Sequence, residues 1–402
     1  MKLVQFGAGN IGRSFIGQLF SRAGYEVVFV DIDERLVRAL NERRQYRVEI
    51  RDENPETLTI TNVRAVHGAD RAAVAEELAD AAVAGTAVGP AALENICPAL
   101  AKGLVLRLRC GAGPLDVIIC ENMRNAAQFM REKLAALLPP DFPLDDYVGL
   151  VETSIGKMVP IISDEQRAKD PLCVYAESYN TLICDALAFK NPIPQVPGLD
   201  PKTNMPAYVD RKLFIHNLGH ALVAYFGHLE LPGAVYVYQA VEHEPVRSAA
   251  RRGMWESARG LIAEYPEEFN EENLGAHIED LLRRFANRAL GDTIFRVGRD
   301  ICRKLSREDR LIGPLLLAAK HGLPAPTIVR GAAAAMLFRG RDEYGELDPL
   351  DRRFAQEIYP RGPEYVLRHV SGLDPRREGE RALIRAICSA HDGLAARLSG
   401  RG

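Results

Sequence analysis

A glycine-rich turn near the N-terminus constrains the fold of this 402-residue chain more than any other feature. The apolar run Lys2–Phe6 ends at the pattern GAGNIG of residues 7–12, and apolar residues at helical spacing follow over residues 11–23. A buried strand, a G-x-G-x-x-G turn and an amphipathic helix in this order are typical of a dinucleotide-binding unit. The glycines let the backbone approach a pyrophosphate, and the helix N-terminus offers unpaired N–H groups to it.

The residue after the second strand indicates which dinucleotide binds. That strand covers residues 26–30, and Asp31 follows it, nineteen residues after Gly12. A carboxylate there accepts hydrogen bonds from the ribose hydroxyls and repels a 2′-phosphate, which favours NAD over NADP. A glycine turn of some other α/β protein would not need this acid, whereas Asp33 is expected to cap a helix.

A second small-residue segment, TAVGP from Thr86, falls where a later strand should end. Small residues there would let the nicotinamide ribose come close, although an ordinary loop before a proline-started helix fits equally well. The residues expected to hold NAD are Gly7, Ala8, Gly9, Asn10, Ile11, Gly12, Asp31, Thr86 and Val88.

The rest of the chain divides into two parts with different patterns of predicted secondary structure. Strands are expected at residues 46–51, 57–63, just before 86, 116–120 and 147–151, with the first two forming a hairpin, and helices at 33–42, 71–79, 91–102 and 124–138. This alternation predicts an α/β fold with a Rossmann-type, doubly wound parallel sheet. Helices at 208–227, 246–264, 274–289 and 330–337 predict a mainly α-helical C-terminal domain. The proline-rich stretch 192–201 places the boundary between a domain of residues 1–195 and one of 196–402, and the last dozen residues are expected to fray.

Composition excludes several classes of protein. The net charge of −3 gives no reason to expect nucleic acid or a membrane surface as a partner, so a small anionic substrate needs a local basic cluster. The seven cysteines form no Cys-x-x-Cys pair, which argues against a disulfide framework and a zinc ribbon. The first strand starts at once, without a signal peptide, and we expect a cytoplasmic protein that is a monomer or a weak homodimer.

The most polar piece of an otherwise apolar helix carries the candidate catalytic residues. Lys212, His216 and His220 recur every four residues and share a helix face. Asn217 lies about 140° from Lys212 in an ideal helix, so the two converge only through the long lysine stem or a helix distortion. A lysine that reaches solvent, beside histidines bonded to local carbonyls, is the alternative.

This segment resembles the signature of the polyol-specific long-chain dehydrogenase/reductase family, in which Lys is followed by Asn five residues on and His three beyond. Here these are Lys212, Asn217 and His220. The resemblance extends over nearly the whole chain, and its length is that of the phosphate-specific branch. The matching stretches are FGAGNIGRSFIG from Phe6, TAVGP from Thr86, CENM from Cys120, RKLFIHNLGHA from Arg211, RVGRDICRKLSREDRLIGP from Arg296 and AAAAMLFR from Ala332.

The resemblance implies a reaction and a role for each residue. Lys212 would be the general acid/base on the reacting oxygen, Asn122 and Asn217 would donate hydrogen bonds to that oxygen, and His220 would hold the substrate and orient the lysine. The implied reaction is the reversible oxidation of D-mannitol 1-phosphate by NAD to D-fructose 6-phosphate. No metal is expected, because the lysine replaces a Lewis acid.

Other functions remain open. A dehydrogenase of the same family could act on an unphosphorylated polyol or a hexuronate, a non-catalytic protein could use the glycine fold to sense NAD, and a metal-dependent dehydrogenase would lose activity on chelation.

The residues that would bind the substrate phosphate are less defined. Arg211, Arg296 and Arg299 are the candidates, within a basic cluster that includes Arg303 and Lys304. The alternative is that these cations pair with nearby acids, namely Asp292, Asp300, Glu308 and Asp309.

The chain also departs from the family pattern in three places. Gly156-Lys157 stands where an acidic-Arg pair is expected, Leu218 stands where threonine is usual, and His216 is an added ionisable group on the helix that carries Lys212.

Overall fold

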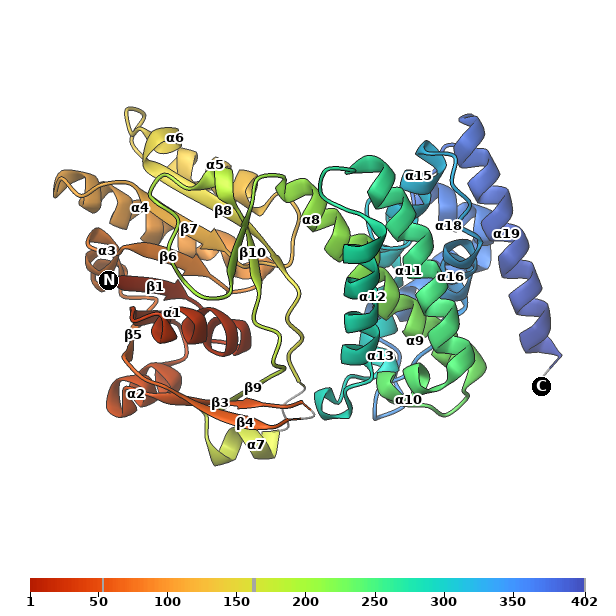
Figure 1. Cartoon of the computed structure of the whole chain (residues 1–402), viewed down its shortest axis with the longest axis horizontal. Helices are drawn as coiled ribbons and strands as arrows, with labels where there is room; N and C mark the ends of the chain where they lie inside the picture. The colour runs from red at the N-terminus through yellow and green to blue at the C-terminus, as the bar shows by residue number, and fades with distance from the viewer. Residues whose placement is uncertain (53, 161–163, 401–402) are drawn as a thin grey trace. The chain divides into compact units, whose positions relative to one another are not determined.

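The computed structural model describes residues 1–52, 54–160 and 164–400 (Figure 1). The chain forms two compact units, Met1–Val209 and Asp210–Gly402, and each is described by itself. The proline-rich stretch 192–201 lies within the first unit, where it leads into the edge strand β11 (Leu199–Lys202).

The first unit is built on an eight-stranded sheet with the order β11-β10-β8-β7-β6-β1-β2-β5. Its strands are β1 (Lys2–Phe6), β2 (Glu26–Asp31), β5 (Val63–His67), β6 (Val83–Thr86), β7 (Leu115–Ile119), β8 (Val148–Ile155), β10 (Leu182–Asp185) and β11. The six strands from β5 to β8 run parallel, whereas β10 is antiparallel to β8. The prediction of a Rossmann-type parallel sheet is therefore confirmed.

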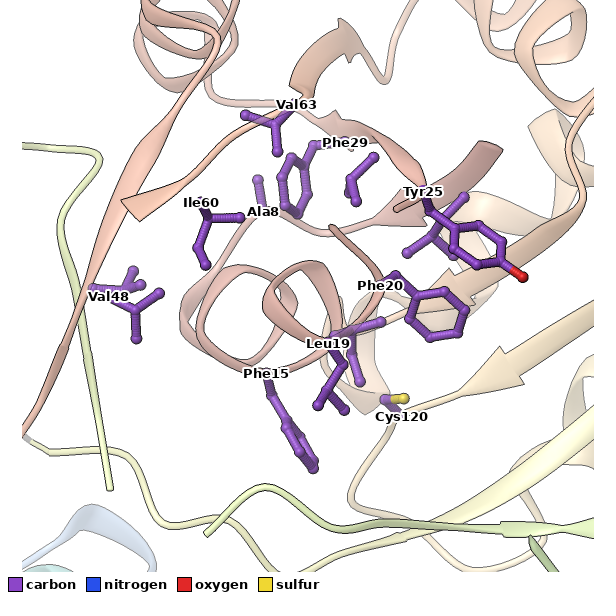
Figure 2. Close-up of a cluster of buried hydrophobic side chains, with 14 of the residues drawn as sticks. Ala8, Phe15, Leu19, Phe20, Tyr25, Phe29, Val48, Ile60, Val63 and Cys120 are labelled. Carbon is purple, nitrogen blue, oxygen red and sulfur yellow. The ribbon is translucent and has the colours of Figure 1, made fainter. Parts of the chain in front are cut away.

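Side chains of each central strand alternate between two hydrophobic cores, as a sheet covered on both faces requires. In β1, Leu3 belongs to one core and Val4 to the other. The first core surrounds the helix that follows the glycine turn, where Phe15 and Phe20 are fully buried (Figure 2). The helices of this unit are η1 (Gly12–Gly17), α1 (Gln18–Arg22), α2 (Glu34–Arg43), α3 (Arg71–Ala79), η2 (Pro90–Ala92), α4 (Leu93–Arg109), α5 (Ala126–Leu137), α6 (Leu144–Tyr147), α7 (Asp164–Lys169) and η3 (Ala186–Ala188).

The predicted hairpin is confirmed, but its second strand ends earlier than predicted. Strands β3 (Tyr46–Ile50) and β4 (Glu56–Ile60) pair antiparallel, and β9 (Val174–Ala176) joins β3 in a separate three-stranded sheet. Asn62 takes a φ of 57°, which turns the chain so that Val63 begins β5 of the main sheet instead of continuing the hairpin.

The second unit is helical, with only an isolated bridge between Tyr236 and Thr293 in its described residues. Its elements are η4 (Lys212–Asn217), α9 (Leu218–Glu230), α10 (Val237–Glu242), α11 (Glu244–Glu264), α12 (Glu271–Phe285), η5 (Arg288–Leu290), α13 (Ile294–Gly298), α14 (Ile301–Lys304), α15 (Ile312–Lys320), α16 (Pro326–Leu337), α17 (Pro349–Arg353), η6 (Phe354–Ile358), η7 (Tyr359–Arg361), α18 (Pro363–His369) and α19 (Glu378–Ser399). Helix α8 (Met205–Arg211) leads into it. The predicted helical C-terminal domain is confirmed.

The expectation that the last dozen residues fray is wrong for residues 391–399. They continue helix α19 to Ser399, and this helix packs against α16 (Figure 1). Residues 401–402 lie outside the described residues. It buries Ile384, Ile387 and Leu394, and this apolar stripe holds the last turns in place. In the described part of the chain, no helix combines the length and apolar character that a membrane span needs.

Candidate functional site

The three glycines of the N-terminal turn have three different physical roles. Gly7 takes a φ of 87°, and a Cβ there would strike the carbonyl of Ala87. A Cβ at Gly12 would strike the carbonyl of Gly7, so the helix packs directly on the turn. By contrast, a Cβ at Gly9 would meet nothing within 4 Å. The turn is therefore closed by Gly7 and Gly12 and open at Gly9, where a pyrophosphate would need access.

Asp31 lies against this turn. Its Oδ2 accepts a hydrogen bond from the backbone N–H of Ala8 at 2.7 Å, and its Oδ1 accepts one from Asp33 at 3.0 Å. Asp33 caps α2, as predicted, by accepting from the amides of Arg35 and Leu36. Each carboxylate oxygen of Asp31 retains a lone pair that a ribose hydroxyl can use.

A residue that the sequence analysis missed joins two of the predicted motifs. The carboxylate of Glu121, from CENM, accepts hydrogen bonds from the backbone N–H groups of Val88 at 2.9 Å and Gly89 at 2.8 Å. Glu121 is buried, so this contact fixes the TAVGP loop against the end of β7. The sequence feature that could have revealed Glu121 is an acidic residue directly after a predicted apolar strand.

Backbone contacts complete the convergence of the three motifs in the first unit. Ala87 N–H bonds to the carbonyl of Phe6 at 2.8 Å, and Cys120 N–H bonds to that of Thr86 at 3.0 Å. The glycine turn, TAVGP and CENM thus meet at the carboxyl ends of β1, β6 and β7, which is where open α/β sheets bind ligands. Asn122 is exposed on the loop that follows β7.

In the second unit, the helix bearing the candidate catalytic residues is distorted between Lys212 and Asn217. Residues Lys212–Asn217 form the π-helical segment η4, in which Leu218 N–H reaches the carbonyl of Leu213. Hydrogen bonds of this i→i+5 type bring residues five apart onto one side of the helix, and such turns are frequent at functional sites. The distortion considered from the sequence is present, and it reduces the separation of about 140° in an ideal helix.

The electrostatic surroundings of Lys212 suit a proton carrier. Burial, and after it the positive charge of Arg310, lower the pKa of Lys212 from 10.5 to about 8. A larger share of this amine is neutral near pH 7 than for a lysine in water, so it accepts a proton more readily.

His220 is held on two sides. Its ring stacks on Phe285, with centroids 4.6 Å apart and planes 5° from parallel, and its Nε2 lies 3.4 Å from Oδ2 of Asp292. Burial lowers the pKa of His220 to about 4, although Asp292 acts in the opposite direction, so the imidazole is neutral at pH 7. His216, buried behind it, has its pKa lowered well below the usual value by burial.

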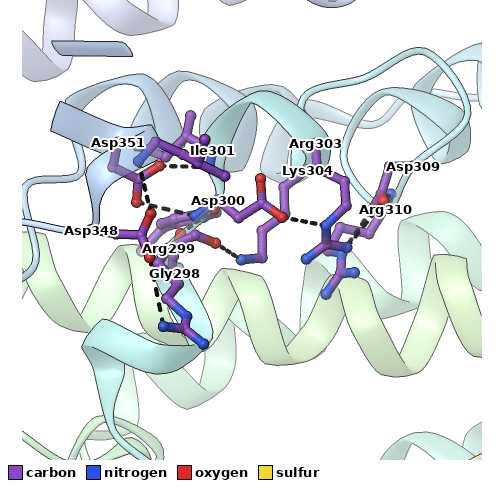
Figure 3. A network of polar contacts seen from close by, with 12 residues as sticks. Gly298, Arg299, Asp300, Ile301, Arg303, Lys304, Asp309, Arg310, Asp348 and Asp351 are labelled. Atoms are coloured by element: carbon purple, nitrogen blue, oxygen red, sulfur yellow. Dashed lines mark hydrogen bonds and ion pairs between the residues drawn. The ribbon is translucent and has the colours of Figure 1, made fainter. Parts of the chain in front are cut away.

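The basic cluster after Asp292 is largely paired with acids (Figure 3). Arg296 contacts Asp292 at 2.6 Å, and Arg299 contacts Asp348 at 3.5 Å. Arg303 pairs with Asp300, and Arg310 with Asp309. Arg211 lies over the ring of Phe269, with 6.0 Å from its guanidinium carbon to the ring centroid.

Lys304 differs from these arginines, because it is buried yet forms no ion pair within the described residues. Its Nζ donates to the carbonyl of Arg299. Burial, together with the charges of Arg310 and Arg303, lowers the pKa of Lys304 to about 7.

Lys157 and Leu218, two of the departures from the family pattern, are buried. The Nζ of Lys157 donates to the carbonyl of Tyr179 at 2.8 Å and to Oδ1 of Asn180 at 2.7 Å, and it lies 5.1 Å from the centre of the Phe15 ring. Leu218 is fully buried in α9.

The structure gathers the predicted residues into two groups. The glycine turn, Asp31, Thr86, Val88 and the loop of Asn122 come together in the first unit, and Lys212, Asn217 and His220 lie on one continuous helix of the second. Over the residues that the structure describes, no group of three or more His, Cys, Asp or Glu side chains is arranged to hold a metal ion.

Two family models match the chain. Residues 1–198 match the mannitol dehydrogenase Rossmann domain, and residues 204–361 match the mannitol dehydrogenase C-terminal domain. Among solved structures, a D-sorbitol dehydrogenase in substrate-free form is similar with a TM-score of 0.76 at 17% identity, covering 96% of this chain and 94% of the other. The Pseudomonas fluorescens mannitol 2-dehydrogenase, solved with NAD and D-mannitol, is similar with a TM-score of 0.67 at 15% identity and the same coverage. At these identities the structures show a shared fold, while the two family models show membership: the chain belongs to the mannitol dehydrogenase family.

Proposed function

We propose that this protein is an NAD-dependent polyol dehydrogenase that oxidises D-mannitol 1-phosphate to D-fructose 6-phosphate and catalyses the reverse reduction. The observation that carries the proposal is the π-helical turn that brings Lys212, with its lowered pKa, and Asn217 to one side of a helix. A structural lysine on a surface helix needs neither the turn nor the burial.

The first unit fits a dinucleotide. Gly9 leaves open space at the turn, a helix begins three residues later at Gly12, and Asp31 has lone pairs left for ribose hydroxyls. NAD, when bound, supplies the hydride acceptor. The negative charge of Asp31 would repel the 2′-phosphate of NADP, which supports NAD as the cofactor.

We expect the chain's own residues to transfer the proton and to stabilise the charge that develops on the oxygen. As hydride leaves the alcohol carbon, the hydroxyl proton would pass to Nζ of Lys212, and the carbonyl oxygen that forms would be stabilised by a hydrogen bond from Asn217. In the reduction, protonated Lys212 returns that proton to the oxygen. His220, neutral and fixed against Phe285, would bind a neighbouring substrate hydroxyl.

The phosphate would be bound by cations of the second unit. Arg211, Arg296 and Arg299 remain candidates, and two further residues join them. Lys304 is a buried ammonium without a carboxylate partner among the described residues, and Arg310 is close enough to Lys212 to lower its pKa. A buried cation gains most from an anionic ligand, because its desolvation is otherwise uncompensated.

One observation favours a second candidate, a dehydrogenase of unphosphorylated polyols or hexuronates. Arg296 and Arg299 each already contact an aspartate, so both would have to exchange that partner for a phosphate.

A single assay separates the candidates. NADH oxidation would be followed with fructose 6-phosphate, fructose and a hexuronate at equal concentrations. We expect turnover with fructose 6-phosphate that exceeds turnover with fructose by at least about tenfold, the effect of one well-placed charged hydrogen bond. Equal rates, or preference for a hexuronate, would reject the phosphate specificity. Tight NADH binding without turnover of any polyol or ketose would support an NAD-sensing protein instead.

A further inference from the structure

The two ring nitrogens of His220 are not equivalent in this structure. A neutral imidazole carries one N–H, and the partner of each nitrogen decides where that hydrogen resides. Oδ2 of Asp292 lies 3.4 Å from Nε2, an ion-pair distance longer than a hydrogen bond, and no other carboxylate of the described residues lies within ion-pair distance of this ring. An ionised carboxylate only accepts hydrogen bonds, so its presence beside Nε2 favours the hydrogen there.

Asp292 is itself fixed by its surroundings. Its Oδ1 accepts from Arg296 at 2.6 Å, and its backbone carbonyl accepts from Val237 at 2.9 Å. Gly291 precedes it with a φ of 62°, a conformation that few other residues adopt without strain. With a side chain only 11% exposed, Asp292 has little freedom to leave His220.

We propose that Asp292 is a positioning residue that holds His220 in the tautomer protonated at Nε2, so that Nδ1 accepts a hydrogen bond from a substrate hydroxyl. Phe285 fixes the plane of the ring and Asp292 fixes its hydrogen. Arg296, by binding the second oxygen of Asp292, keeps that carboxylate in place. The substrate contact rests on the proposed function, whereas the tautomer does not.

The tautomer can be measured without substrate. Nitrogen-15 NMR of the full-length protein labelled at histidine distinguishes an N–H from a bare nitrogen in each ring, and His220→Gln assigns the signal. We expect the wild-type protein to show Nε2 protonated and Nδ1 bare. In Asp292→Asn the side-chain amide can donate to Nε2, and the hydrogen should move to Nδ1, as occurs when the aspartate of a catalytic triad is replaced by asparagine.

The chain offers a matched control. Glu264 forms a second histidine–carboxylate pair, with 2.7 Å between its Oε2 and Nε2 of His321. Glu264→Gln should alter only the His321 signal and leave His220 and activity unchanged.

Kinetics supply a second readout. Asp292→Asn should lower kcat by about 10- to 100-fold, the loss typical of removing the residue that orients a metal-binding histidine, while NAD binding stays as in the wild type. Arg296→Gln separates positioning from phosphate binding, because a positioning role lowers kcat with any substrate and a phosphate contact raises KM for the phosphorylated one.

Arg296→Gln also serves if Asp292→Asn does not fold, because loosening Asp292 should then give a mixture of both tautomers. The proposal is overturned if wild-type His220 is protonated at Nδ1, or if its tautomer is the same in a folded Asp292→Asn variant. An inactive protein with the expected tautomer would reject the proposed function alone.

Discussion

The carboxylate of Asp31 accepts a hydrogen bond from the backbone amide of Ala8, with 2.7 Å between Oδ2 and N. The acid proposed to discriminate between cofactors therefore also supports the turn that would bind their pyrophosphate. Changes at Asp31 should affect both the choice of cofactor and the affinity for it.

Asp31→Ser should weaken NAD binding and improve binding of NADP. The loss of charged hydrogen bonds to the ribose is worth about 1.5–3 kcal/mol, or roughly 10- to 100-fold in KM for NAD. Removing the negative charge also removes the repulsion of a 2′-phosphate. The KM values for both cofactors measure this change, and Asp33→Asn, which removes a neighbouring charge while retaining a helix cap, should leave their ratio unaltered.

Lys212→Ala should abolish most turnover without preventing cofactor binding. General acid/base catalysis contributes about 10²- to 10⁴-fold, and kcat should fall by that order. Binding of NADH, followed by its fluorescence, should match the wild-type protein. A variant retaining more than a third of the wild-type kcat would contradict the role of this lysine.

The activity of the wild-type enzyme should depend on pH through Lys212. Its pKa of about 8 means that the amine is protonated below pH 8 and neutral above it. Alcohol oxidation needs the neutral amine, so kcat/KM should rise as the pH increases through about 8. Ketose reduction needs the protonated amine and should fall over the same range. Profiles of both directions that move together would argue against Lys212 as the shared proton carrier.

Glu121→Ala should loosen the TAVGP loop. It leaves the backbone N–H groups of Val88 and Gly89 without their acceptor, at a cost of about 1–3 kcal/mol for each one that stays buried. We expect a lower urea midpoint and a higher Kd for NAD. Glu152→Ala, which removes one hydrogen bond to Ala127 in the same unit, is the comparison and should raise the Kd for NAD less.

Lys304→Met should raise the stability of the protein and weaken its binding of a phosphorylated substrate. The pKa of Lys304 is about 7 in the folded state and 10.5 for a lysine in water. Between pH 7 and about 10 this amine is therefore protonated in the unfolded chain and neutral in the folded one. Wild-type stability should therefore rise with pH across this window, and the variant should lose that rise.

At pH 7 the same variant should gain about 1–3 kcal/mol in the free energy of unfolding, since a buried charge is removed, while KM for fructose 6-phosphate should increase. Urea unfolding at pH 7 and 9 tests the first effect. Lys320→Met, at an exposed lysine paired with Glu264, should show neither effect.

Much of the fold was predictable because its signals are local. The period of apolar residues identified most strands and helices, and the glycine turn with Asp31 nineteen residues after Gly12 indicated the parallel sheet. Strands β5, β9, β10 and β11 were not predicted from the sequence, and β5 was missed because only two residues separate it from the hairpin. Helix α19 was not predicted either, because its terminal residues are polar and small.

The sequence by itself determined the glycine turn, the acid at the end of β2 and the order Lys212, Asn217, His220, since each depends on spacing along a strand or helix. Only the tertiary structure decided that Glu121 fixes the TAVGP loop, that Arg296 contacts Asp292, and that a π-turn lies between Lys212 and Asn217. The first two are contacts of individual side chains, which no periodic pattern specifies because several nearby acids could have been the partner. The π-turn is a local distortion of a helix, and the spacing of apolar residues does not predict where such a distortion lies.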